Sequence, residues 1–160
     1  MRLVIAAVGR LKDGPERVLF ERYCDRLEAS GRSLGLGPVR LFEVPEGRAP
    51  ARAVRVADEA ERLLAKVSDT DVKVALDEHG KSPTSEAFAA FLRERRDAGA
   101  GALAFLIGGP DGHGPAALSA ASLRMSLGPM TLPHGLARIV LIEQIYRAAT
   151  ILAGHPYHRA

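Results

Sequence analysis

Two patterns of apolar and polar positions alternate along this chain. Continuous apolar runs, typical of strands buried on both faces of a sheet, are followed by segments whose apolar residues recur every three or four positions, typical of helices. The runs predict strands at residues 3–8, 39–44, 72–77, 102–107 and, briefly, 125–127. The periodic segments predict helices at residues 16–29, at 51–67, from 82–86 onward, shortly after 115, and at 136–152.

This alternation predicts an α/β fold, with a mostly parallel sheet that has helices on both faces. A chain of 160 residues with 47% hydrophobic content can bury one core, so we expect a single domain over residues 1–160. Ligands of such sheets bind beyond the carboxyl ends of the strands. The loops after Leu76, Ile107 and Leu127 are therefore the first places to expect a binding site.

Composition narrows the function classes. No apolar run approaches the roughly 18 residues that a membrane-spanning helix needs. The apolar start at residues 1–8 lacks the length and cleavage site of a signal peptide, so we expect a cytoplasmic protein. The single cysteine, Cys24, can form neither an internal disulfide nor a cysteine-rich zinc site. A net charge of +3 permits RNA as a partner without demanding it.

Residues 108–114 hold four glycines directly after a predicted buried strand. The loop matches neither of the glycine-rich phosphate-binding patterns, G-x-G-x-x-G and G-x-x-x-x-G-K-[ST]. Glycines at this place would let the backbone approach a ligand closely, but an ordinary structural turn explains them as well. Both interpretations stay open on this loop alone.

Arg138 is unusual for its position in the predicted helix 136–152. Glu143 and Arg147 share one side of that helix with Gln144 and are spaced for an ion pair. Arg138 falls on the opposite, apolar side and in the first turn, where a positive charge opposes the helix dipole. We expect it either to have a phosphate or carboxylate partner or to extend to solvent at the helix start. The apolar flanks of this helix also suggest a subunit interface.

The segment 155–159, H-P-Y-H-R, carries groups that suit RNA. Tyrosine stacks on bases, histidine titrates near neutral pH, and arginine contacts phosphates. A terminus without a function of its own is the alternative. Two histidines are too few ligands for zinc, so no metal site is expected.

Several short motifs occur together in this order in a known family. They are L-V-I-A-A-V-G at 3–9, L-D-E-H-G-K at 76–81, L-I-G-G-P-D-G at 106–112, T-L-P-H at 131–134, E-Q-I-Y-R-A at 143–148 and H-P-Y-H-R at 155–159. The combination extends over essentially the whole chain. It closely resembles the RlmH family, small stand-alone members of the SPOUT methyltransferase superfamily.

The resemblance implies an α/β fold whose C-terminal part forms a deep trefoil knot, a homodimer, and S-adenosylmethionine as the cofactor. It further implies methylation of N3 of a pseudouridine (the position-1915 type, in helix 69) of 23S ribosomal RNA within the ribosome or large subunit, without metal or membrane. The cofactor-binding residues that it implies are Leu76, Gly108, Leu127, Gly128, Pro129, Met130, Thr131 and Leu132. These residues fall on the same three loops that the strand pattern indicates.

The expected chemistry also indicates catalytic candidates. The N3–H of a uracil-like ring is weakly acidic, so the enzyme must favour its deprotonation or stabilise the anion. His134, Arg138, His158 and Arg159 are the available positive or titratable groups, and Tyr157 is a candidate for stacking. The residues assign no general base. A non-catalytic RNA-binding dimer of the same fold and an unrelated nucleotide-binding α/β enzyme are the alternative functions.

Overall fold

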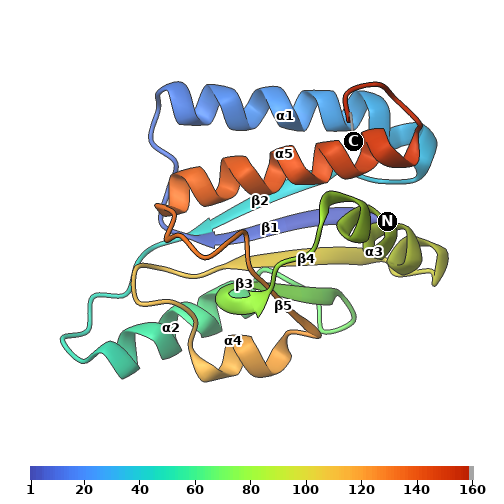
Figure 1. Ribbon diagram of the computed structural model, residues 1–160. Helices are drawn as coiled ribbons and strands as arrows, with labels where there is room; N and C mark the ends of the chain where they lie inside the picture. The colour runs from blue at the N-terminus through green and yellow to red at the C-terminus, as the bar shows by residue number, and fades with distance from the viewer. Residues whose placement is uncertain (159–160) are drawn as a thin grey trace.

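A five-stranded sheet with parallel pairings forms the centre of the protein, in the order β2-β1-β4-β3-β5 (Figure 1). The computed structural model describes residues 1–158. Its elements are β1 (Arg2–Val8), α1 (Pro15–Gly31), the short 3₁₀ helix η1 (Arg32–Leu34), β2 (Val39–Val44), α2 (Arg52–Leu64), β3 (Val72–Lys81), α3 (Ser85–Asp97), β4 (Ala102–Ile107), α4 (Pro115–Ala120), β5 (Leu123–Met125) and α5 (His134–Leu152). The predicted α/β class, a parallel sheet flanked by helices, is confirmed; the deep trefoil knot stays a prediction.

The two middle strands explain the continuous apolar runs of the sequence. β4 lies between β1 and β3, and every residue of β4 is buried, as is every residue of β1 from Leu3 onward. A strand covered by helices on both faces has no solvent side, so consecutive positions are apolar. Burial on both faces makes these strands the rigid base on which the loops at their carboxyl ends are held.

Helices cover the sheet in two layers. Figure 1 shows α1 and α5 along one side of the strands and α2 and α4 along the other. α3 packs against α5 and joins the first layer through Phe88 and Leu92, which belong to the same apolar cluster as Leu27 of α1 and Ile142 of α5. The second layer forms a smaller apolar cluster around Leu63 of α2. The apolar stripes of the helices therefore complete both halves of the core.

β3 is longer than the sequence pattern predicts. Residues 78–81 were expected to form a loop, but Lys81 pairs with Met125 of β5 after a shift in register that follows the Leu76–Met125 pair. Gly80 allows this second pairing, because a Cβ there would lie 2.6 Å from the backbone nitrogen of Met125. The expectation of a simple loop is wrong since an irregular strand is not visible as an apolar run.

The boundaries of the last two elements also differ from the prediction. A brief strand was expected at 125–127, but β5 ends at Met125, and the side chain of Ser126 bonds the next turn rather than continuing the sheet. α5 begins at His134, before the predicted start at Leu136. Pro133 directly precedes the helix and has no N–H to satisfy, which suits a helix start. His134 is thereby placed on the first turn of a rigid helix.

Candidate active site

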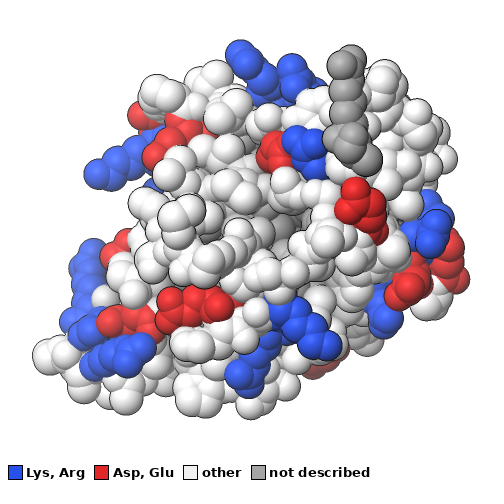
Figure 2. Space-filling model, viewed as in Figure 1, with Lys and Arg blue, Asp and Glu red and all other residues white. Residues whose placement is uncertain are grey.

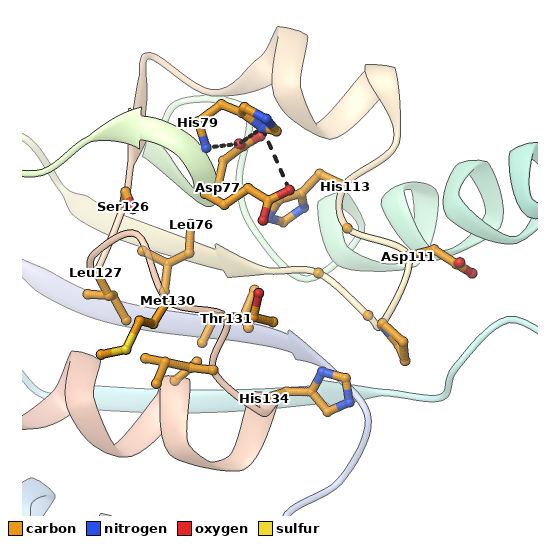
Figure 3. Close-up of a pocket in the computed structure, with 18 of the residues that line it drawn as sticks. Leu76, Asp77, His79, Asp111, His113, Ser126, Leu127, Met130, Thr131 and His134 are labelled. Carbon is orange, nitrogen blue, oxygen red and sulfur yellow. Dashed lines mark hydrogen bonds and ion pairs between the residues drawn. The ribbon is translucent and has the colours of Figure 1, made fainter.

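A cavity of about 620 Å³ opens at the carboxyl edge of the sheet (Figure 3). The irregular end of β3 and the loops after β4 and β5 meet there, together with the first turn of α5, at the edge of the sheet that the strand pattern predicts. Small-molecule sites have volumes of roughly 300–1,000 Å³, so the cavity is large enough for a cofactor. Seven of the eight expected cofactor-binding residues line it, namely Leu76, Gly108, Leu127, Gly128, Met130, Thr131 and Leu132, whereas Pro129 does not.

The glycine-rich loop after β4 is folded tightly on itself. The N–H of Gly112 donates to the carbonyl oxygen of Gly109 at 3.0 Å. A Cβ on Gly108 would lie 2.7 Å from the carbonyl oxygen of Gly112, and Gly112 itself has a φ of 81°, in the region that favours glycine. The glycines are therefore needed for a close backbone turn, and this turn forms a wall of the cavity.

A pair of arginines of α2 holds the outer end of this loop. The Nε of Arg55 donates to the Asp111 carboxylate at 2.8 Å, and Arg52 approaches the same carboxylate at 3.7 Å. The hydrogen bond from Arg55 is the main cause that lowers the pKa of Asp111. Asp111 therefore remains ionised at neutral pH, and its charge is balanced by α2.

The loop after β5 is held by a serine hydroxyl. Ser126 is buried; its Oγ donates to the carbonyl oxygen of Gly128 at 2.9 Å and accepts from the N–H of Gly128 at 3.2 Å. This local turn directs Leu127 and Thr131 to the cavity, while Met130 remains 81% exposed. An apolar side chain with that exposure at the rim of a cavity is available to contact a ligand or another molecule.

Asp77 and His79 lie together beside the end of β3 (Figure 3). The Asp77 carboxylate accepts from the backbone N–H of His79 at 2.8 Å and lies 3.3 Å from its Nδ1. The His79 ring is 83% exposed, whereas the Asp77 side chain is 14% exposed and lines the cavity. The irregular end of β3 thus brings a partly buried carboxylate to the cavity.

His113 lies deeper, next to Asp77 in Figure 3. Both of its ring nitrogens are buried without a clear hydrogen-bond partner among the described residues. Burial lowers the pKa of His113, and this outweighs the opposing effect of the Leu76 and Leu106 backbones. The imidazole is therefore neutral at pH 7 and acts as part of the packed floor of the site.

Arg138 has the carboxylate partner that its position in the sequence predicts. Its guanidinium donates to Glu43 Oε1 at 3.2 Å and to the carbonyl oxygens of Val8 and Gly9 at 2.5 and 2.8 Å. The side chain is 1% exposed and is not among the residues that line the cavity. These bonds tie α5, near its start, to the ends of β1 and β2, and the expected role of Arg138 as a catalytic cation stays a prediction. His134, four residues earlier, does line the cavity.

The C-terminal tail packs against the middle of α5. Tyr157 Oη donates to Glu143 Oε1 at 3.0 Å, and the Arg147 guanidinium lies 4.9 Å from the centre of the Tyr157 ring. The predicted pair of Glu143 and Arg147 is confirmed at 2.6 Å. The Tyr146 ring lies 4.8 Å from that of Tyr157, and burial, with hydrogen bonds to Tyr23 and Glu143, raises the pKa of Tyr157. We call Tyr23, Glu143, Tyr146, Arg147 and Tyr157 the tail cluster.

His158 reaches a different helix. Its Nε2 lies 2.8 Å from Glu86 Oε1 in the first turn of α3. A backbone hydrogen bond and this contact with His158 are the main causes that lower the pKa of Glu86. Arg159, the remaining candidate, lies outside the described residues. Tyr157 and His158 thus both have side-chain partners on helices of the same chain, and the role of the tail stays a prediction.

Several residues of the site were not singled out from the sequence. Asp77, Asp111 and Ser126 line the cavity and Glu143 anchors the tail, yet none was a candidate. Asp77 is the polar residue at the end of an apolar run, which is a usable signal at the carboxyl edge of a predicted strand. Glu143 carried no signal beyond its spacing to Arg147, because its tyrosine partner comes from a separate segment.

Neither a metal-binding cluster nor a membrane-spanning helix is found in the described part of the chain. Among residues 1–158, no group of three or more His, Cys, Asp or Glu side chains is placed to hold a metal ion. Within the same residues, no helix has the length and apolar character needed to cross a bilayer.

Comparison with known proteins assigns the family. The family model described as "Predicted SPOUT methyltransferase" matches residues 1–158. The ribosomal RNA large subunit methyltransferase H of Bradyrhizobium diazoefficiens is 49% identical over 160 residues, and that of Xanthobacter autotrophicus is 51% identical, each match covering 100% of both chains. The chain therefore belongs to the SPOUT methyltransferases and, within them, to the ribosomal RNA large subunit methyltransferase H family.

A solved structure gives a more distant likeness. The SpoU methyltransferase AviRb from Streptomyces viridochromogenes matches with a TM-score of 0.41 and 15% identity, over 96% of this chain and 60% of the other.

Proposed function

We propose that this protein is an S-adenosylmethionine-dependent methyltransferase that modifies N3 of a pseudouridine in helix 69 of 23S ribosomal RNA. The observation that carries the proposal is the cavity at the carboxyl edge of the sheet, where the three loops with the family's cofactor residues meet. Family membership supports the reaction class, and the names of the relatives support large-subunit RNA as the target. The protein acts in the cytoplasm as a single domain over residues 1–160.

The residues of the cavity fit S-adenosylmethionine. The backbone of the Gly108–Gly112 turn is close enough that a Cβ would collide, so this wall offers main-chain polar groups rather than side chains. Leu76, Leu127 and Leu132 supply apolar surface for a flat ring. When bound, the cofactor supplies a methyl group made electrophilic by its sulfonium charge.

The protein's part is to orient the reactants and handle one proton. A rigid sheet and the first turn of α5 hold the cavity walls, which favours alignment of the two reacting atoms. His134 is the catalytic candidate that lines the cavity, and its imidazole can take up the proton from N3. Arg138 keeps His134 in place through its bonds to Glu43 and the β1 carbonyls.

Two of the tail candidates, Tyr157 and His158, are not among the residues that line the cavity of the same chain. Tyr157 Oη bonds Glu143, which is roughly 14 Å farther along α5 than His134 at about 1.5 Å per residue. Reacting groups must approach to about 3–3.5 Å, so this tail does not serve this cavity in the arrangement observed. If both regions act in one reaction, a second copy must bring its tail to the cavity.

We therefore propose a homodimer formed in part by α5. Leu136 on the outer side of this helix is 43% exposed, and Met130 at the cavity rim is 81% exposed. Large exposed apolar side chains next to a binding site mark an interaction surface. A second copy placed there would bury these side chains and bring a tail to the site.

The direct test is methylation by the purified protein. Large-subunit RNA from a strain lacking the gene should acquire N3-methylpseudouridine when its ribosomes are incubated with the protein and S-adenosylmethionine, and mass spectrometry of the helix 69 fragment would locate the mark. A parallel reaction with the His134→Ala variant should be slower by at least about tenfold, a usual contribution of proton transfer.

Two outcomes would contradict the proposal. Calorimetry that detects no binding of S-adenosylmethionine would favour the non-catalytic RNA-binding dimer, whereas binding of ATP or NAD in its place would favour a nucleotide-dependent enzyme. Equally, a protein that stays monomeric in sedimentation at micromolar concentration while fully active would contradict the shared site.

A further inference from the structure

Basic and acidic side chains are interspersed on the face of the protein that Figure 2 shows, but the charged groups that line the cavity do not balance. Its ionised lining residues are Arg52, Asp77, Glu78 and Asp111. Asp111 is paired with Arg52 and Arg55, so it contributes little net charge to the cavity. Asp77 and Glu78 have no comparable cation, because within residues 1–158 the ion-pair partner found for either is the imidazole of His79.

His79 is a weak source of positive charge at this place. Its ring lies 3.3 Å from Asp77 and 3.9 Å from Glu78, but the side chain is 83% exposed and carries a charge only when protonated. Neither carboxylate therefore has a permanently charged partner at the end of β3, and Asp77, with 14% of its side chain exposed against 70% for Glu78, is the more enclosed of the two.

The two forms of the cofactor differ by one charge. S-adenosylmethionine carries a sulfonium, an ammonium and a carboxylate, for a net charge of +1. S-adenosylhomocysteine, which remains after methyl transfer, has lost the sulfonium charge and is neutral overall. An uncompensated carboxylate near the site attracts the first more strongly than the second, and low solvent access weakens the screening of this attraction.

We propose that Asp77, assisted by Glu78, is a specificity-determining residue that makes the cavity favour the cationic methyl donor over its neutral product. The inference rests on the proposed function, since it assumes that the cavity takes S-adenosylmethionine. Its consequence for turnover is that loss of the methyl group itself weakens binding and promotes release of the spent cofactor.

The test compares three ligands by calorimetry at pH 7.5: S-adenosylmethionine, S-adenosylhomocysteine and sinefungin, in which a carbon bearing a protonated amine replaces the sulfur and its methyl group. Asp77→Asn keeps the oxygen that accepts from the His79 N–H while removing the charge. We expect this variant to lower the affinity ratio of S-adenosylmethionine to S-adenosylhomocysteine by about three- to tenfold, because it removes one negative charge from a partly screened site. The affinity for sinefungin should fall together with the affinity for S-adenosylmethionine, because both ligands carry a net positive charge.

Two further variants complete the design. Glu78→Gln should shift the same ratio by a smaller factor, about twofold, because its side chain is 70% exposed and better screened. This variant provides a second measurement if Asp77→Asn folds poorly. Asp97→Asn, on the exposed end of α3 beside Arg96, removes the same charge away from the cavity and should leave the ratio unchanged.

The outcomes separate this inference from the function on which it rests. If the wild-type protein binds S-adenosylmethionine but neither Asp77→Asn nor Glu78→Gln changes the ratio, the charge discrimination is wrong and the cofactor assignment stands. An equal loss of all three ligands would likewise contradict it, since Asp77 would then be a contact without preference for charge. Failure of the wild-type protein to bind any of them would overturn both proposals.

Discussion

The cofactor cavity and the tail cluster lie along the same helix, α5, but they are built differently. Two walls of the cavity are tight backbone turns, Gly108–Gly112 on one side and Ser126–Gly128 on another, and side chains line the rest. The tail cluster is made of ionised and aromatic side chains, with the Glu143 carboxylate accepting from both Tyr157 and Arg147. The first region therefore depends on which positions lack a Cβ, and the second depends on which side chains are present.

The two regions should therefore respond differently to a substitution. A backbone wall is lost when an added side chain forces the turn open, even if the rest of the protein stays folded. A side-chain cluster can lose one group and retain its backbone course, at the cost of a hydrogen bond or a packed ring. Four variants test this distinction, in order of decreasing expected effect.

The largest effect is expected where α5 is fixed beneath the cavity. Arg138→Met should lower the free energy of unfolding by about 3 kcal/mol, because it leaves the Glu43 carboxylate and two β1 carbonyl oxygens without their buried donor. Urea denaturation at pH 7 measures it. Arg93→Met, at an exposed position of α3, should change stability by less than about 0.5 kcal/mol. A loss below about 1 kcal/mol at Arg138 would show that Glu43 is well solvated without it.

Gly108→Val should weaken S-adenosylmethionine binding at least about a hundredfold, roughly 2.7 kcal/mol. Its Cβ would lie 2.7 Å from the Gly112 carbonyl oxygen, so the turn must open. Calorimetry gives the affinity, and the melting temperature shows whether the fold persists. Gly101→Val is the matched control, because a Cβ at Gly101 has no atom within 4 Å and its φ is ordinary. Undiminished binding by Gly108→Val would remove this turn from the cofactor site.

Truncation before His155 should slow methylation of ribosomes at least about tenfold, equivalent to about 1.4 kcal/mol of transition-state stabilisation. Cofactor affinity should stay within about twofold, since residues 155–158 do not line the cavity of their own chain. Stability should fall by about 1–2 kcal/mol, because the Tyr157 ring leaves its place against Tyr146.

Tyr157→Phe is the control for that truncation. It keeps the ring and removes only the hydroxyl that donates to Glu143. This variant should therefore retain most of the stability that the truncated protein loses. Full activity of the truncated protein would show that the tail has no part in the reaction, and a loss of folding would make its role purely structural.

The smallest expected effect is a pH dependence of the free energy of unfolding that comes from His113. Burial lowers its pKa in the folded protein below the ordinary value of 6.5, so the unfolded chain takes up the proton first as pH falls. Its contribution to stability is complete above pH 6.5 and is lost progressively as pH falls toward the folded-state pKa. Unfolding measured from pH 7.5 to 5 should show a shallower decline for His113→Leu than for the wild type. Parallel curves would mean that the imidazole titrates alike in both states.

The apolar runs were sufficient to predict the strands and the edge where the site lies. They failed at residues 78–81, because the return of β3 to pairing at Lys81 depends on the close approach of Gly80 to β5. Seven of the eight expected cofactor residues line one cavity, while Pro129 lies outside its lining. Main-chain course decides which members of a loop face inward, and that course is set by the Ser126 hydroxyl.

Arg138 shows most clearly what the sequence by itself determined. A cation on the apolar side of a helix, in its first turn, must have a buried partner or reach solvent, and this requirement follows from helix periodicity and dipole alone. Only the tertiary structure decided that the partner is Glu43, 95 positions away, together with the carbonyls at the end of β1. The same holds for Glu143 and Tyr157. Local periodicity places a side chain on a face, but the partner across that face comes from whichever strand or segment the packed layers bring there.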